Sequence, residues 1–327
     1  MSLARDSLIR ASQSVWLREH ATRWSFVNRA SRRFLPGERV EDALAAAEIL
    51  RRMEIESMLS RLGENVTQAS EAEAVAEHYV GVLAKMRARD LPGSLSVKLT
   101  QLGLDLGEEV CWKNLERILE AGSVESETAR PDNRVSAGLS RRTSGTIWID
   151  MESSAYVDRT LAMYRRAREK CANVGVCLQA YLRRTPADLE ALLPLGPAIR
   201  LVKGAYKENA DVAFPQKRGV DAAYFELAKR MMAKDAIAAG AVAGIATHDT
   251  AMIGRICEFA AGAGVPREQL EFQMLYGIAR GEQERLARAG HRVSVLISYG
   301  TAWFAWYMRR LAERPANVWF VVKNLAG

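Results

Sequence analysis

The feature that most constrains this chain is an alternation of short apolar runs with longer amphipathic stretches, repeated from residue 57 onward. Eight such runs occur, and most end in polar residues before the next helix-like stretch begins. They span residues 57–59, 95–99, 146–150, 175–179, 199–203, 244–248, 270–275 and 292–297. Strands that alternate with helices in this way favour a parallel sheet with crossover helices.

The count and spacing of these runs predict the fold class. Eight strand–helix units over about 270 residues are typical of an α/β protein of the (β/α)8 TIM-barrel type. A doubly wound open sheet is the alternative, but such a sheet usually has a glycine-rich turn after its first strand, and this chain has none there. We therefore expect a barrel over residues 55–327, preceded by an N-terminal helical arm over residues 1–54. Residues 120–145 are polar and turn-rich and predict a surface loop.

Composition places the chain among soluble globular proteins, with 49% hydrophobic and 26% charged residues. The 4 cysteines lack metal-ligand spacing, which indicates reduced thiols and a cytoplasmic setting. No stretch approaches the roughly 18 uninterrupted apolar residues of a membrane span. The first twenty residues are interrupted by charges and lack the apolar core of a signal peptide.

The formal net charge of +7 raises the question of a nucleic-acid partner. The basic residues are interleaved with acidic ones rather than gathered into one stripe, which disfavours nucleic-acid binding. An anionic substrate or an anionic lipid surface accounts for the excess charge equally well.

Candidate functional residues follow from the fold, because a TIM barrel places its site at the C-terminal ends of its strands. The polar residues at these ends are Lys98, Asp150, Gln179, Arg200, Lys203, Thr247, His248, Gln273 and Tyr276. A charge that points into a barrel is costly unless it is paired or binds a ligand. Each residue has a simpler explanation when taken alone: Lys98 and Asp150 could merely pair, and His248 could be structural. Their convergence on one rim favours a polar site.

Two further segments suit ligand binding. Gly204 and Ala205 directly follow a predicted strand, so backbone N–H groups there could approach a phosphate or a flavin edge closely. A plain tight turn explains this glycine equally well.

The last predicted helix, over about residues 301–314, ends before Pro315. Helical spacing puts Trp303, Trp306 and Arg310 on one stripe, with Arg309 beside them. Two adjacent arginines can bind a carboxylate through paired, charge-assisted hydrogen bonds. The alternative is that the arginines are solvated and the aromatic residues are core.

Taken together, these segments resemble the proline dehydrogenase family. The matching segments are SVKLTQLGLDL, IWIDMES, VCLQAYLRRTPADL, IRLVKGAY, ATHD, FQMLYG and YGTAWFAWYMRRLAERPANVWF, in the family's order across residues 55–325. The combination of IRLVKGAY with the arginine-containing tail is far more specific than a single short motif.

The resemblance implies a flavoenzyme that oxidises L-proline to 1-pyrroline-5-carboxylate. FAD would take a hydride at N5, and a quinone, reached at the membrane surface, would then accept the electrons. No nucleic acid and no metal are implied as partners. Arg309 and Arg310 match the pair that binds the proline carboxylate.

The remaining roles carry over position by position. Asp150 and Arg200 would be catalytic, with Arg200 at the N5 side of the flavin and Lys98 paired with Asp150 beside the substrate. The other residues implied to form the substrate pocket are Tyr206, Leu275 and Trp306. The residues implied to hold FAD are Met151, Gln179, Arg200, Lys203, Gly204, Ala205, Thr247 and His248.

Two positions depart from the family pattern. Trp306 stands where a tyrosine usually packs against the substrate, and Leu296 stands where the last strand usually has another tyrosine. The competing substrates are therefore hydroxyproline, pipecolate, a modified proline or an N-alkyl amino acid. A flavin-free barrel lyase or hydrolase, with Lys98 and Asp150 as an acid–base pair, is a competing hypothesis about the reaction. A catalytically silent flavin-binding protein is a further one.

Overall fold

Eight parallel strands form a closed barrel in the computed structural model, which describes residues 34–63, 65–91, 93–128 and 145–303. The strands are β1 (Glu56–Arg61), β2 (Gly93–Val97), β3 (Ile147–Ile149), β4 (Val174–Gln179), β5 (Ala198–Val202), β6 (Val242–Ala246), β7 (Leu270–Leu275) and β8 (Arg292–Tyr299). Each strand pairs with the next along the chain, and β8 closes the barrel by pairing with β1. The predicted (β/α)8 barrel is thus confirmed, and each of the eight predicted runs overlaps a strand.

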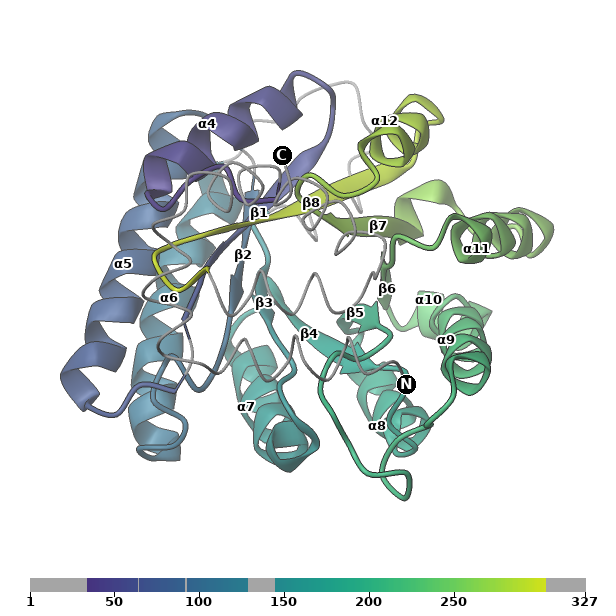
Figure 1. Ribbon diagram of the computed structural model, residues 1–327, viewed down its shortest axis with the longest axis horizontal. Coiled ribbons are helices and arrows are strands. Elements are labelled where there is room, and N and C mark those ends of the chain that lie inside the picture. The colour runs from purple at the N-terminus through teal and green to yellow at the C-terminus, as the bar shows by residue number, and fades with distance from the viewer. Residues whose placement is uncertain (1–33, 64, 92, 129–144, 304–327) are drawn as a thin grey trace, which may run out of the picture.

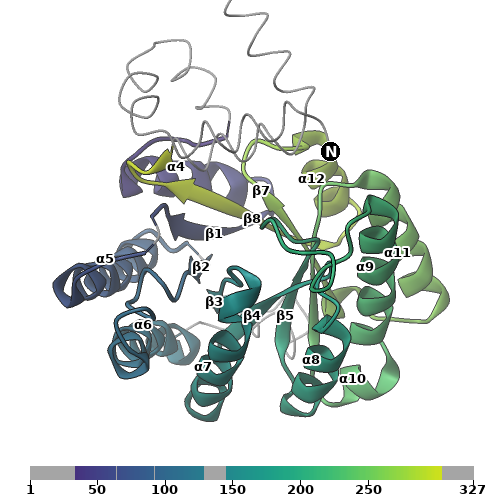
Figure 2. The same ribbon diagram turned by 60° about the horizontal axis from the view of Figure 1, so that its bottom comes forward.

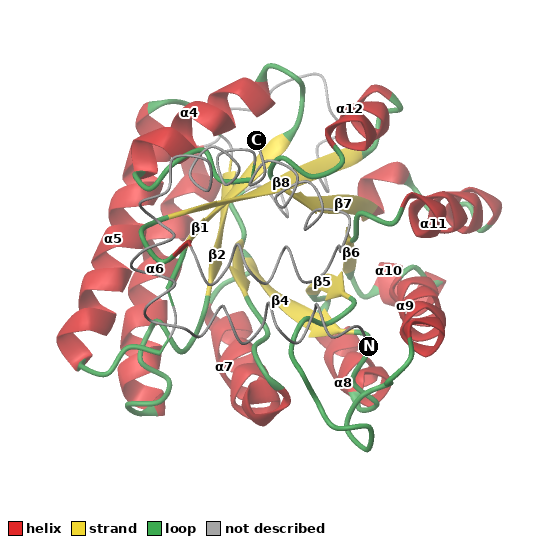
Figure 3. Ribbon diagram, in the orientation of Figure 1, coloured by secondary structure: helices red, strands yellow, loops and turns green. Residues whose placement is uncertain are grey.

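Helices surround the barrel on its outside (Figures 1 and 2). They are α4 (Val40–Arg51), α5 (Ala69–Ala88), α6 (Glu108–Thr128), α7 (Val157–Lys170), α8 (Thr185–Leu192), α9 (Lys217–Met231), α10 (Lys234–Ala238), α11 (Thr250–Gly262) and α12 (Arg280–Arg288). Short 3-10 turns lie at Ser154–Tyr156, Leu193–Leu195 and Arg267–Gln269. Figure 3 shows the resulting outer layer of helices around an inner layer of strands.

Part of the predicted N-terminal arm lies within the described residues. Helix α4 packs against β1 and β8, and Leu44 and Leu50 on its inner face are buried. Residues 1–33 of the predicted arm lie outside the described residues, as does the predicted last helix beyond residue 303. The division of the chain at residue 54 stays a prediction.

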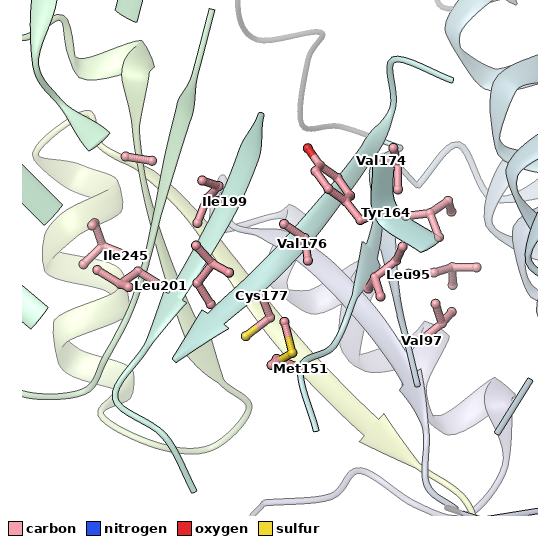
Figure 4. Close-up of a cluster of buried hydrophobic side chains, with 14 of the residues drawn as sticks. Leu95, Val97, Met151, Tyr164, Val174, Val176, Cys177, Ile199, Leu201 and Ile245 are labelled. Carbon is pink, nitrogen blue, oxygen red and sulfur yellow. The ribbon is translucent and has the colours of Figure 1, made fainter. Parts of the chain in front are cut away.

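The main apolar core lies between the barrel and its helices. Side chains alternate along a strand, so Val174 and Val176 of β4 face outward, as do Ile199 and Leu201 of β5. Figure 4 shows these residues together with Tyr164, which α7 contributes to the same core. Burying one such aliphatic side chain stabilises the fold by about 1.5–3 kcal/mol.

The inside of the barrel is filled differently. Trp148 of β3 forms a small apolar cluster with Met58, Ala198 and Val242, and Leu296 packs against this cluster. A Cβ atom on Gly175 would lie 2.6 Å from Cε3 of Trp148, so glycine at this position makes room for the indole. The cluster forms a floor, and polar side chains lie above and below it.

The predicted loop over residues 120–145 is wrong in its first part. Helix α6 continues to Thr128, so residues 120–128 are helical, while residues 129–144 lie outside the described residues. Gly122, which lies inside this predicted loop, marks a close approach, because its added Cβ would lie 3.3 Å from Cδ1 of Ile147. Packing against β3 therefore extends the helix past residues that favour a turn.

Candidate active site

The polar residues expected at the barrel rim converge because all eight strands end on the same side. Lys98 comes directly after β2, Asp150 directly after β3, and Gln179 is the last residue of β4. The backbone N–H of Asp150 donates to the carbonyl of Val97 over 2.9 Å, which extends the sheet pairing to the rim. The carboxylate of Asp150 is thereby fixed beside the side chains of β2.

Asp150 is the centre of this group. Its Oδ2 lies 2.8 Å from Nζ of Lys98, and its Oδ1 accepts from Oγ of Ser96 at 2.6 Å and from Nη1 of Arg200 at 2.8 Å. Burial alone would raise the pKa of Asp150, but the attraction of Lys98 and Arg200 holds that pKa below its usual value. Asp150 is therefore an ionised carboxylate at neutral pH.

Arg200 is held on every side. It is buried, its Nε donates to Oε1 of Gln273 over 2.7 Å, and its Nη1 also donates to Oγ of Ser96 over 2.8 Å. Its Nη2 lies 2.8 Å from Sδ of Met58, and the guanidinium carbon lies 4.9 Å from the centre of the Trp148 ring. A guanidinium with these contacts has one orientation and presents a fixed positive charge to the rim.

Two residues of this group were not predicted from the sequence. Ser96 and Trp148 were not considered, although each lies two residues before a candidate, Lys98 and Asp150 respectively, and so faces the same side of its strand. Gln273 was among the polar candidates expected at the strand ends, but its contact with Arg200 was not predicted. Alternation along the strands is the signal that could have found Ser96 and Trp148.

Gln179 and its neighbours form a second part of the site. The Nε2 of Gln179 donates to the carbonyls of Met151 over 3.3 Å and of Glu152 over 3.1 Å. Among the residues that the structure describes, the buried Oε1 of Gln179 has no hydrogen-bond partner. A buried acceptor of this kind suits an N–H donor of a bound ligand.

The segment after β5 needs its glycine. Gly204 has a φ of 113°, and a Cβ on it would lie 2.2 Å from Cδ1 of Tyr181. The backbone therefore lies directly against the tyrosine ring, which no other residue would allow. Ala205 is exposed and Tyr206 is half-buried in the turn that follows.

Lys203 lies in a charged group with two acids. Its Nζ lies 2.6 Å from Oδ1 of Asp221 and 2.9 Å from Oδ2 of Asp249. The hydrogen bond from Lys203 lowers the pKa of Asp249, which also caps α11 by accepting from the N–H of Met252. Asp221 also lines a surface hollow of about 500 Å³ with the basic residues Lys217, Arg218 and Arg255.

The other expected cofactor residues lie next to this group. Oγ1 of Thr247 accepts from the N–H of Asp249 over 3.2 Å. Nε2 of His248 accepts from the N–H of Leu275 over 2.9 Å, so that nitrogen bears no proton. His248 therefore joins β6 to the end of β7, where the half-buried Leu275 is the last strand residue.

Three expected substrate residues, Trp306, Arg309 and Arg310, lie outside the described residues. Leu296 of β8 is described, and it packs against the apolar floor formed by Met58 and Trp148. Within the described parts of the chain, no group of three or more His, Cys, Asp or Glu side chains could hold a metal ion. No helix among those residues is both long and apolar enough to cross a membrane.

Residues 43–323 match the profile of the family described as proline dehydrogenase. The chain belongs to the proline dehydrogenase family. It is 37% identical over 295 residues to proline dehydrogenase 1 of Bacillus subtilis strain 168, covering 90% of each chain. It is 34% identical over 298 residues to a proline dehydrogenase of Deinococcus radiodurans, covering 90% of this chain and 89% of that one. These relatives support an oxidoreductase that acts on proline.

The fold is similar to that of larger solved proteins. Proline utilization A of Bdellovibrio bacteriovorus, solved after inactivation by N-propargylglycine, superimposes with a TM-score of 0.75 at 23% identity. The match covers 88% of this chain but 33% of the other, so this chain spans about a third of that protein. At this identity the likeness bears on the barrel fold alone.

Proposed function

We propose that this protein is an FAD-dependent dehydrogenase that oxidises L-proline to 1-pyrroline-5-carboxylate. The observation that supports this most is the arrangement of Lys98, Asp150 and Arg200 at the rim, in a chain of the proline dehydrogenase family. Two fixed cations around one half-buried carboxylate leave net positive charge where an anionic amino acid and an electron-rich cofactor would lie. A flavin-free lyase or hydrolase would use the same Lys98–Asp150 pair as acid and base, so flavin absorbance separates the two hypotheses.

The proposed roles divide between the two sides of the substrate. Arg309 and Arg310 would bind its carboxylate, and Tyr206, Leu275 and Trp306 would form the pocket walls. Lys98 and Asp150 would lie paired beside the substrate at the pocket wall, and Arg200 would face the reacting ring. Because Asp150 and Arg200 fix one another, neither side chain has to reorganise when the substrate binds.

The residues present fit FAD. Bound FAD would supply the oxidation by accepting a hydride at N5 from the ring carbon next to nitrogen, while the nitrogen loses its proton to give the C=N bond of the product. The unpartnered Oε1 of Gln179 would accept from the flavin ring, and Met151 would lie beside it. The residues that would hold the ribityl and phosphate parts are Lys203, Gly204, Ala205, Thr247 and His248.

The proposed setting follows from charge and composition. A cytoplasmic protein with a net charge of +7 would be drawn to the anionic inner face of a membrane, where a quinone would accept the electrons from the reduced cofactor. In this proposal the barrel over residues 55–327 holds both sites, and residues 1–54 form the N-terminal helical arm.

An anaerobic absorbance titration of the purified protein with L-proline tests the proposal. We expect a flavin band near 450 nm, which proline bleaches. A colourless protein that takes up no added FAD would contradict the flavin assignment. A yellow protein that no amino acid bleaches would indicate a silent flavin-binding protein.

A second candidate substrate class is favoured by one observation. Leu296 packs against the cluster that contains Met58 and Trp148, so an apolar side chain stands inside the barrel where the family usually has a phenol. A larger or more apolar ring, such as pipecolate, would suit this change better than proline. The same titration with pipecolate and 4-hydroxyproline separates the candidates. The variants Leu296→Tyr and Trp306→Tyr are expected to shift preference toward proline, and identical selectivity before and after would remove both residues from the pocket.

A further inference from the structure

A column of polar side chains runs through the inside of the barrel, from Arg200 near the rim to the opposite end. Nε of Arg200 donates to Oε1 of Gln273 over 2.7 Å, and Nε2 of Gln273 donates to Oε1 of Glu271 over 3.0 Å. Oε2 of Glu271 lies 3.3 Å from Nη2 of Arg292, whose Nη2 lies 3.7 Å from Oε1 of Glu56. Arg200 is thus linked to charges at the N-terminal end of the barrel.

The chemistry of the groups fixes the direction of the first two bonds. An arginine Nε can only donate, and an ionised carboxylate can only accept. Gln273 lies between these two, so its amide has one orientation, with the oxygen toward Arg200 and the nitrogen toward Glu271. Gln273 is 3% exposed and Glu271 is 2% exposed, so both partners are shielded from bulk water.

The neighbouring strand is shaped around this amide. A Cβ on Gly244 of β6 would lie 3.0 Å from Nε2 of Gln273 and 3.0 Å from the carbonyl of Ile199. The bare backbone of Gly244 therefore makes room for the amide and limits its movement on that side. On the other side the amide is held by Arg200 and Glu271.

We propose that Gln273, held by Glu271, is the positioning residue that fixes the orientation of Arg200. The inference rests on the proposed function, in which Arg200 faces the flavin. A glutamine is suited to this place because one end accepts from a cation while the other donates to an anion. Loss of the amide removes the partner of the Arg200 Nε–H and the partner of Oε1 of Glu271, so the guanidinium is then free to tilt away from Asp150.

The direct test observes Arg200 itself and needs no flavin. In 15N-labelled protein, the Nε–H signal of Arg200, identified by its loss in Arg200→Lys, is expected to exchange slowly with solvent. Gln273→Met keeps the size of the side chain but removes both hydrogen bonds. We expect exchange of that signal to become at least about tenfold faster, the scale of one lost hydrogen bond to a charged group. Unchanged exchange in Gln273→Met would overturn the proposal.

A swapped variant provides the rescue. In Gln273→Glu combined with Glu271→Gln, the new carboxylate accepts from Arg200 and the new amide donates to that carboxylate. We expect slow exchange of the Arg200 signal to return, whereas Gln273→Glu alone places two carboxylates side by side and fails to restore it. If Gln273→Met does not fold, the exchange of the Arg200 Nε–H signal is measured in the double variant and in Glu271→Gln instead. Fast exchange in the double variant would count against the proposal.

A second measurement connects the column to the cofactor. With Arg200 released, the reduced flavin loses a nearby fixed cation, so the flavin midpoint potential in Gln273→Met is expected to become more negative. Asn114→Leu is the matched control, because Asn114 is a buried amide that donates to the carbonyl of Leu102 from α6 and has no contact with Arg200. It should lose stability without changing the potential or the Arg200 signal. If the wild type binds no flavin, the proposed function fails, while the exchange measurement still decides the role of Gln273.

Discussion

At the C-terminal end of the barrel one carboxylate, Asp150, lies between two cations, Lys98 and Arg200, whereas at the N-terminal end one cation, Arg292, lies between two carboxylates, Glu56 and Glu271. The first group has an excess of positive charge and holds the pKa of its carboxyl down. In the second, burial raises the pKa of Glu56 to about 7, opposed by Arg292 and supported by Glu271. The C-terminal group thus has two cations for one acid, and the N-terminal group has two acids for one cation.

This difference in charge decides which end can bind an anion. In the proposed function, a bound carboxylate or a reduced flavin would meet at the C-terminal end a cation that Asp150 does not fully neutralise. At the N-terminal end the same ligand would meet two acids. The proposed function therefore assigns binding to one end of the barrel and a structural role to the other, and Gln273 joins the two charged groups.

The largest effect is expected from Asp150→Asn, which removes the acid that lies between Lys98 and Arg200 at the rim. Breaking a buried pair in this way should lower the free energy of unfolding by about 3 kcal/mol. Proline-dependent dye reduction should fall at least roughly 100-fold, the scale of losing one preorganised charge at a reacting centre. Urea unfolding and steady-state kinetics check both values.

The matched control for that variant is Asp158→Asn. The Asp158 side chain is 82% exposed and pairs with Arg184 at the surface, so stability should change by less than about 0.5 kcal/mol. An equal loss in both variants would mean that position in the barrel has no influence on the value of an ion pair.

Arg292→Met removes the cation at the N-terminal end of the barrel. It leaves Glu271, which is 2% exposed, without its cation, and should cost about 3 kcal/mol of stability by the same reasoning. The KM for proline should stay unchanged, because the lost charge lies at the end that binds no substrate. Urea unfolding and KM measured together distinguish this from Asp150→Asn, and a large rise in KM would contradict the separation of the two ends.

Gly244→Ala acts between the two ends. The added methyl meets the Gln273 amide and the Ile199 carbonyl, so we expect a loss of about 1–3 kcal/mol by overpacking. Gly254→Ala on α11 is the control, since nothing lies within 4 Å of its added Cβ. It should stabilise the helix by about 0.5–1 kcal/mol. Thermal unfolding of both variants gives the comparison, and a stabilised Gly244→Ala would show that the amide is not confined.

The smallest effect is a change in pH dependence. The pKa of Glu56 is raised in the folded protein, so between the ordinary value of 4.5 and about 7 the folded state binds more protons than the unfolded state. Stability from this group is present at low pH and is lost as the pH rises through that window. Glu56→Gln should therefore reduce the fall in the free energy of unfolding across this pH range, as measured by urea unfolding. Glu77→Gln, at an exposed position, should keep the wild-type slope.

The sequence predicted the fold well because its information is local. The alternation of apolar and polar residues within each run, and the amphipathic stretches between runs, are set by neighbours along the chain. The prediction went wrong at residues 120–128, where a polar composition favoured a loop. There α6 continues because Gly122 lets the helix approach Ile147 of β3, a contact that composition does not encode.

For the site, the sequence by itself determined which polar residues reach the rim. Lys98, Asp150 and Gln179 follow from the rule that strands of a parallel barrel end on one side. Which side chains touch was decided only by the tertiary structure, because contacts inside a closed barrel depend on the register between strands and on the size of the residues opposite. Arg200 meets Ser96 and Gln273 across the barrel since Trp148 fills the floor and Gly244 leaves room for the amide.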